Sequence, residues 1–182
     1  MPRLFVGLEL PETHCEQLLT LQGGVKGARW QDRAQLHLTL RFIGDVDGRD
    51  ANDVVAALSE LKFTPFQAQL SGVGNFGKNG FMRALWAGVQ PVEPFENLHK
   101  KVDRALTNMG LEAERRRYRP HVTLARFSKA PRRSEIDEYM HRNALFQSDD
   151  FDVNTISLFL SELGHMGAHY TVVERFPALL GS

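Results

Sequence analysis

The sequence predicts an α+β fold: a bilobal internal duplication of a β-α-β-β unit, with antiparallel sheets facing a central cleft. Three observations predict it. Short stretches rich in β-branched and aromatic residues alternate with stretches whose apolar residues recur at helical spacing. These elements follow in the same order in both halves of the chain. Both halves also carry the word His-x-Thr-Leu, at 37–40 and again at 121–124.

The elements of the first half follow from apolar spacing and from the residues that end each stretch. A strand over 3–10 stops at Pro11, and a helix over 11–23 is broken by two glycines. The first unit, about 30–90, then begins with the strand that carries the first motif. Its expected elements are a strand over 36–44, a helix over 48–61, a strand over 66–76, a turn at 77–80 and a strand over 81–89.

A helix over 94–110 is expected to link the units, because apolar residues form one stripe along it, with His99 on its surface. Trp86 and Tyr170, on the two returning strands, are 84 residues apart, as the motif histidines are. They are expected in the core or the cleft wall. The second unit, about 115–176, repeats the order of the first with a strand over 119–127, a helix over 133–142, a strand over 151–163, a turn at 164–167 and a strand over 168–176.

Length and composition suit one domain of two pseudo-symmetric lobes over 1–182. The chain is 42% apolar and 24% charged, which is ordinary for a globular protein. Its 22 basic and 22 acidic side chains balance, so the net charge favours no class of partner. A single cysteine, Cys15, rules out an internal disulfide, and no stretch approaches the roughly 20 apolar residues of a membrane span. We expect a cytoplasmic monomer with no membrane contact.

The local distribution of charge is uneven. Basic residues dominate 114–133, where Glu114 is the only acidic residue, and acidic residues follow over 135–152. One interpretation is two solvated faces. The other is a basic rim beside the second motif that holds phosphates.

The repeated His-x-Thr-Leu motif places polar and apolar side chains on opposite faces of a strand. Residues i and i+2 of a strand share a face, so His37 and Thr39 point to one side and the intervening leucines to the other. His121 and Thr123 repeat this arrangement. If a pseudo-twofold axis relates the halves, two imidazoles and two hydroxyls face one volume.

Two histidines across a small cleft suit in-line displacement at phosphorus. One imidazole removes a proton from the attacking group and the other delivers a proton to the leaving oxygen, both near neutral pH. Threonine hydroxyls donate to the non-bridging oxygens, and a nearby arginine offsets the developing charge. Neither motif contains a carboxylate or a metal-binding word, so no metal or cofactor is expected.

Three stretches, "RLFVGLELP", "LHLTLRFIGD" and "RPHVTLAR", carry a resemblance to a known family. The sequence resembles the 2H phosphoesterase superfamily, defined by two His-x-Thr/Ser-x motifs in duplicated lobes. Within it, the chain is similar to the RNA 2′,3′-cyclic phosphodiesterases, also called 2′-5′ RNA ligases. The likeness spans nearly the whole chain. It implies hydrolysis of a terminal RNA 2′,3′-cyclic phosphate to a 2′-phosphate.

The resemblance also implies roles for individual residues. His37 would be the proton donor to the departing 3′ oxygen, and His121 the proton acceptor that activates water. Thr39 and Thr123 would hold phosphate oxygens, and Arg126 would lie near the substrate. Two further residues are candidates from the sequence pattern: Arg41, on the His37 face by strand alternation, and Phe5, as a stacking surface for a base or as a core aromatic.

Three other functions remain open at this point. The substrate could be a small nucleotide such as ADP-ribose 1″,2″-cyclic phosphate or a 2′-5′ oligoadenylate. The reverse reaction, 2′-5′ joining of RNA, is allowed at the same two histidines by microscopic reversibility. A protein that binds RNA ends without turnover would use the cleft and the basic rim, but it would not need two titratable groups facing each other.

Overall fold

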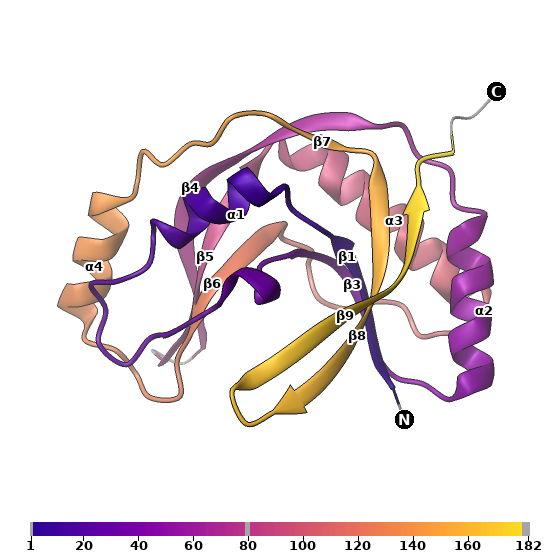
Figure 1. Ribbon diagram of the computed structural model, residues 1–182, viewed down its shortest axis with the longest axis horizontal. Helices are drawn as coiled ribbons and strands as arrows, with labels where there is room; N and C mark the ends of the chain where they lie inside the picture. The colour runs from indigo at the N-terminus through magenta and orange to yellow at the C-terminus, as the bar shows by residue number, and fades with distance from the viewer. Residues whose placement is uncertain (1, 79–80, 180–182) are drawn as a thin grey trace.

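An antiparallel sheet forms the centre of the computed structural model, which describes residues 2–78 and 81–179 (Figure 1). Within these residues, nine strands pair in the order β7-β4-β5-β6-β3-β1-β8-β9, with β2 beside β6. The predicted α+β class with antiparallel strands is confirmed. The strands are β1 (Arg3–Leu8), β2 (Arg29–Trp30), β3 (Leu38–Asp45), β4 (Phe66–Lys78), β5 (Phe81–Gln90), β6 (His121–Arg126), β7 (Phe151–Val153), β8 (Thr155–Gly164) and β9 (Gly167–Pro177). The helices are α1 (Glu12–Leu19), a 3₁₀ turn at Arg33–Gln35, α2 (Gly48–Ser59), α3 (Val92–Asn108) and α4 (Arg133–Arg142).

Each motif strand lies on the same side of the sheet as the hairpin of the other half of the chain, β6 directly beside it and β3 with β1 in between. The β4–β5 hairpin, from the first half, lies against β6, which carries the second motif. The β8–β9 hairpin, from the second half, lies against β1, and β1 pairs with β3, which carries the first motif. The sheet therefore consists of two parts, β7-β4-β5-β6 and β3-β1-β8-β9, that exchange hairpins. The division into two sequence units stays a prediction.

The core lies under the face of the sheet opposite the motif side chains. Leu38, Leu40, Val122 and Leu124 are almost fully buried. The predicted apolar stripe of α3 contributes further buried residues, and α3 packs against β3 and α2. In Figure 1, α2 and α3 lie beside the β3-β1-β8-β9 part, whereas α1 and α4 lie beside β4, β5 and β6. None of the helices within the described residues is long and apolar enough to cross a membrane.

Several predicted boundaries differ from the observed ones. The helix expected over 11–23 ends at Leu19, because the chain then bends through bonds of the i→i+3 type, such as Leu21 N–H to the Leu18 carbonyl. The strand expected over 151–163 divides at Asn154, where the chain leaves the edge of β4 and joins β1. The turn expected at 77–80 lies partly outside the described residues, and the turn at 164–167 joins β8 to β9.

The prediction that His99 lies on the surface is wrong. Its side chain is only 9% exposed, because position 99 follows Phe95 by four residues and so lies on the apolar stripe of α3. Its Nδ1 lies 2.7 Å from the Leu40 carbonyl, and its ring stacks on Tyr118 with the centroids 4.2 Å apart. The imidazole joins α3 to β3 and to the segment before the second motif.

Candidate active site

The two motif strands meet at one residue pair, Leu38 of β3 opposite Val122 of β6. Both side chains are fully buried on the core face. Side chains alternate along a strand, so the residues on either side of this pair point to the other face. The register thus gathers four predicted residues on one face: His37, Thr39, His121 and Thr123.

The antiparallel register gives these four side chains a pseudo-twofold arrangement. Extended by one residue in each direction from the Leu38–Val122 pair, this register sets His37 across from Thr123 and Thr39 across from His121. The two histidines are diagonal neighbours, a relation that typically separates residues by roughly 7–8 Å. The rings are close enough for the charge of His121 to contribute to the lowered pKa of His37.

Both imidazoles are held in the same way by the backbone. His37 Nδ1 lies 2.8 Å from the carbonyl of Gln35, and His121 Nδ1 lies 2.7 Å from the carbonyl of Arg119. A carbonyl only accepts, so each Nδ1 carries the proton and each neutral Nε2 is left with its lone pair. Nε2 of His37 lies 2.9 Å from the Thr39 hydroxyl, which donates to it. Each histidine thus presents Nε2 as its proton-accepting atom.

Aromatic rings from the exchanged hairpins surround both histidines. The His37 ring centroid lies 4.9 Å from that of Tyr170 on β9, and the His121 centroid lies 6.0 Å from that of Trp86 on β5. These are the two aromatic residues that the sequence placed at equivalent positions. Phe5 is 2% exposed, and its ring lies 4.8 Å from that of His37. Phe5 therefore supports His37 from behind and offers little surface to a base.

Burial lowers the pKa of both histidines. The pKa of His37 is lowered to about 4 by loss of hydration; the bond to the Gln35 carbonyl opposes this, and the charges of Arg126 and His121 add to it. Loss of hydration also lowers the pKa of His121, again with opposition from a backbone carbonyl and help from Arg126. Both imidazoles are therefore predominantly neutral at neutral pH in the unliganded protein.

A bulge in β3 changes which side chains reach the cleft. Leu40 has no partner on β1 between the pairs formed by Thr39 and Arg41, so the alternation shifts by one residue. Arg41 is consequently buried, and Phe42 is 57% exposed. The prediction that Arg41 lies on the face of His37 is wrong for this reason. Phe42, which strand alternation assigned to the other face, was missed.

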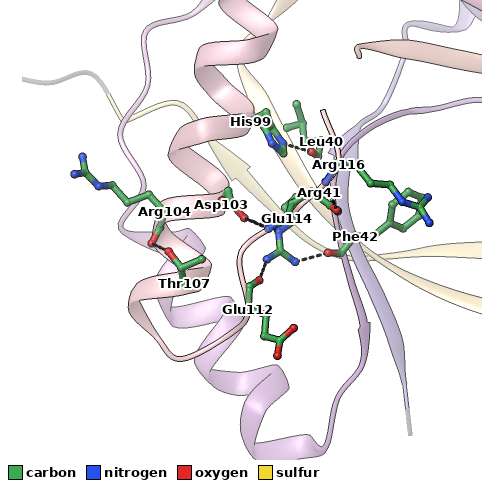
Figure 2. Close-up of polar contacts among 10 residues, drawn as sticks. All are labelled: Leu40, Arg41, Phe42, His99, Asp103, Arg104, Thr107, Glu112, Glu114 and Arg116. Atoms are coloured by element: carbon green, nitrogen blue, oxygen red, sulfur yellow. Dashed lines mark hydrogen bonds and ion pairs between the residues drawn. The ribbon is translucent and has the colours of Figure 1, made fainter. Parts of the chain in front are cut away.

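The guanidinium of Arg41 is bound on the α3 side of β3 (Figure 2). Its Nε donates to the carboxylate of Asp103 over 2.9 Å, and its other nitrogens donate to the carbonyls of Phe42 and Glu112. Arg41 still borders a cavity beside Thr39. Three of the five N–H donors of the guanidinium are used within the protein, which holds Arg41 against α3.

A second bulge, in β6, acts in the opposite way on Arg126. Leu124 has no partner on β5 between the pairs of Thr123 and Ala125. The alternation shifts again, so Ala125 is buried and Arg126 is exposed beside His37, where both border one cavity. The two motif strands thus share the same irregularity, one residue after each threonine. This bulge turns Arg126 toward the cavity that His37 borders, and its contact with substrate stays a prediction.

Two cavities open beside the motif residues, and Phe42 borders both. The cavity on the His37 side has a volume of about 410 Å³ and is bordered by Arg126, Tyr170 and Phe5. The cavity on the His121 side has a volume of about 740 Å³ and also borders Thr39. Each histidine therefore borders a cavity of its own.

This α+β fold with an antiparallel sheet is that of the 2H phosphoesterases. Residues 10–164 match the family model of the 2′-5′ RNA ligase superfamily. The chain belongs to this superfamily.

Curated relatives and solved structures agree with this assignment. The chain is 34% identical to the RNA 2′,3′-cyclic phosphodiesterase of Thermus thermophilus, over 96% of this chain and 89% of the relative. It is 26% identical to the protein of the same name from Methanocaldococcus jannaschii, over 96% of this chain and 99% of the relative. A crystal structure of a Thermus thermophilus protein superposes with a TM-score of 0.79 at 28% identity, covering 96% of this chain and 97% of that one. The fold is also that of Escherichia coli LigT complexed with 3′-AMP, with a TM-score of 0.78 at 21% identity, covering 98% of this chain and 99% of that one.

Proposed function

We propose that this chain hydrolyses RNA 2′,3′-cyclic phosphate ends to 2′-phosphomonoesters without a metal ion. The observation that supports the proposal is the Leu38–Val122 pair, which joins the two strands that carry the His-x-Thr motifs. The names of the curated relatives, RNA 2′,3′-cyclic phosphodiesterase, support this choice of substrate.

In the proposed reaction, the two imidazoles move one proton each. His121 Nε2 takes a proton from water as the water oxygen bonds to phosphorus, and His37 Nε2 gives a proton to the departing O3′. The bond from phosphorus to O3′ breaks and the 2′-ester remains. For the next turnover His37 regains a proton and His121 releases one. Arg126, beside His37, stabilises the charge that builds on the phosphate.

The test is to incubate the protein with a 2′,3′-cyclic mononucleotide and with a cyclic-ended oligonucleotide, each with EDTA, and to locate the product phosphate. We expect the 2′-monoester in both cases. A 3′-monoester, or loss of turnover in EDTA, contradicts the proposal. Turnover confined to small substrates such as ADP-ribose 1″,2″-cyclic phosphate favours that alternative, and binding without product favours an RNA-end-binding protein.

The same groups allow 2′-5′ joining, in which a 5′-hydroxyl replaces water as the attacker. We propose this as a second reaction of the site, because proton removal by His121 and proton delivery by His37 are unchanged. A cytoplasmic location, where RNA ends arise, is proposed with it and is consistent with the free, buried thiol of Cys15.

Removing either threonine hydroxyl is expected to lower kcat by roughly 10²- to 10³-fold, the usual effect of losing one donor to a charged transition state. Thr39→Ala also removes the donor to His37 Nε2, so it should raise the pKa that limits kcat/KM at alkaline pH, whereas Thr123→Ala should not. Steady-state kinetics with a cyclic mononucleotide measure both effects. Thr39→Ser and Thr123→Ser are the matched controls and should retain most of the activity.

The pH profile should show the lowered pKa values of the free protein. The acid, His37, must be protonated, and its pKa of about 4 makes this form scarcer as the pH rises. The base, His121, must be neutral, and because its pKa is lowered it stays neutral at pH values somewhat below the ordinary histidine pKa. We therefore expect kcat/KM to peak on the acid side of the ordinary histidine pKa of 6.5.

Substrate binding should move the profile, because a bound phosphate anion favours the imidazolium form of both histidines. We expect kcat, which reports the bound state, to peak at a higher pH than kcat/KM. Initial rates measured with EDTA between pH 4 and 9, on the order of two per pH unit, resolve the two curves. Coincident optima at or above neutrality contradict the expectation.

A further inference from the structure

The cavity beside His121 is much larger than a water attacker needs. Its volume is about 740 Å³, whereas a water molecule occupies about 30 Å³ in the liquid. Cavities of 300–1,000 Å³ typically hold small organic ligands. In the proposed reaction the attacking group approaches from the His121 side, so whatever occupies this cavity lies next to the attacker.

The lining of this cavity combines positive charge with aromatic surface. Arg116 and Arg117 border it and are exposed, and within residues 2–78 and 81–179 neither belongs to an ion pair. Phe42 is 57% exposed at its rim, and Phe76 is partly exposed. Guanidinium groups bind phosphate and exposed rings stack on bases, which together is the chemistry of single-stranded nucleic acid binding.

Arg116 and Arg117 belong to the segment 112–118, the arginine segment, which is fixed at both ends. At its start, the Arg41–Asp103 pair binds it: Arg41 donates to the Glu112 carbonyl, and the Glu114 N–H donates to Asp103 over 3.1 Å (Figure 2). At its end, the Tyr118 hydroxyl donates to the Thr39 carbonyl over 3.0 Å. The segment is therefore attached directly to the first motif strand, and it holds Arg116 and Arg117 at a set position beside the cleft.

We infer that this cavity binds the 5′-terminal nucleotides of a second RNA strand, whose 5′-hydroxyl is the attacker in 2′-5′ joining. The inference rests on the proposed function, because it needs His121 as the base. The 5′ oxygen bonds to phosphorus and its proton passes to His121 Nε2. The bond from phosphorus to O3′ breaks, and O3′ takes a proton from His37. Arg116 and Arg117 bind the phosphates of the incoming strand, and hydrolysis of a cyclic mononucleotide does not require them.

The experiment uses cytidine 2′,3′-cyclic phosphate as donor and a 5′-hydroxyl oligouridylate with a 3′-deoxy end as the second strand. For the wild-type chain, we expect added strand to lower the yield of hydrolysis product, by blocking water or by forming joined product. For Arg116→Gln/Arg117→Gln, the strand concentration for half-maximal effect should rise roughly tenfold or more, since charged hydrogen bonds are lost. The rate at which this double variant hydrolyses the donor alone should stay within about twofold of the wild-type rate, which is a small change in free energy.

The matched control is Arg132→Gln/Arg133→Gln, which removes the same charge from exposed positions that border neither cavity. It should keep the wild-type response to the strand. The inference is overturned if the strand leaves wild-type hydrolysis unchanged without joined product, or if both double variants respond alike. Absence of donor hydrolysis by the wild-type chain contradicts the proposed function instead. In that case fluorescence anisotropy of the labelled strand still shows whether Arg116 and Arg117 bind it, and equal affinity for both double variants rejects the subsite.

Discussion

Replacing His121 with asparagine is expected to lower kcat for a cyclic mononucleotide by about 10³-fold, and His37→Asn is expected to do the same. General acid–base catalysis by one positioned group is typically worth 10²- to 10⁴-fold, and here each imidazole would move a proton that no neighbour replaces. Asparagine is smaller but keeps a polar side chain, so the surrounding contacts change little. Steady-state kinetics with EDTA present measure the loss.

A substrate with a better leaving group separates the two roles. A nucleoside diester that expels 4-nitrophenolate needs little protonation of its leaving oxygen, so the loss in His37→Asn should shrink to a small fraction of the loss on the cyclic substrate. The loss in His121→Asn should stay the same on both substrates, because the attacking water still has to lose its proton. The reverse pattern would mean that the acid and base assignments must be exchanged.

The fold must be intact for these kinetics to be interpreted. Each substitution removes one bond from Nδ1 to a backbone carbonyl but no side chain of the apolar core, so thermal unfolding midpoints should stay close to that of the wild-type chain. Wild-type turnover by either variant on its true substrate would contradict the catalytic role of that residue.

Strand alternation predicted correctly which face the side chains of 37–40 point to, but it predicted the wrong face for Arg41. The sequence placed His37 and Thr39 on one face and their leucine neighbours on the other, as observed. The bulge at Leu40 then turned Arg41 away from the cleft. A bulge is an extra residue relative to the partner strand, so it is a property of the pairing, and one strand read alone carries no mark of it.

The exchange of hairpins could not be predicted from the repeat. Matching order and spacing indicated that each half contains a motif strand and a hairpin, and the structure contains both. Which hairpin lies beside which motif strand depends on contacts between distant parts of the chain. Trp86 therefore contacts the histidine of the opposite motif, and so does Tyr170. Only the equivalence of these two aromatic residues could be predicted.

Replacing Asp103 with alanine is expected to lower the free energy of unfolding by about 3 kcal/mol, because it leaves the buried guanidinium of Arg41 without its carboxylate. The side chain of Asp103 is 22% exposed and that of Arg41 is 6% exposed. Water can therefore hydrate the Arg41 guanidinium only poorly after the change. Burial alone raises the pKa of the Asp103 carboxyl. The bonds from Arg41 and the Glu114 N–H outweigh this, and the net pKa is lowered. Urea unfolding near neutral pH, where the carboxylate is charged, measures the effect.

The pH dependence and a double variant distinguish loss of the ion pair from loss of packing. Because the folded-state pKa of Asp103 is lowered, its contribution is present above the unfolded value of 3.8 and is lost as the pH falls through the folded value. The gap in stability between the wild-type chain and Asp103→Ala should therefore narrow on acidification. Adding Arg41→Met to Asp103→Leu should recover much of the stability lost by Asp103→Leu alone, since no buried charge then remains. A gap that is constant with pH, with no recovery in the double variant, would mean that Asp103 acts by packing and that the arginine segment is anchored mainly through Tyr118.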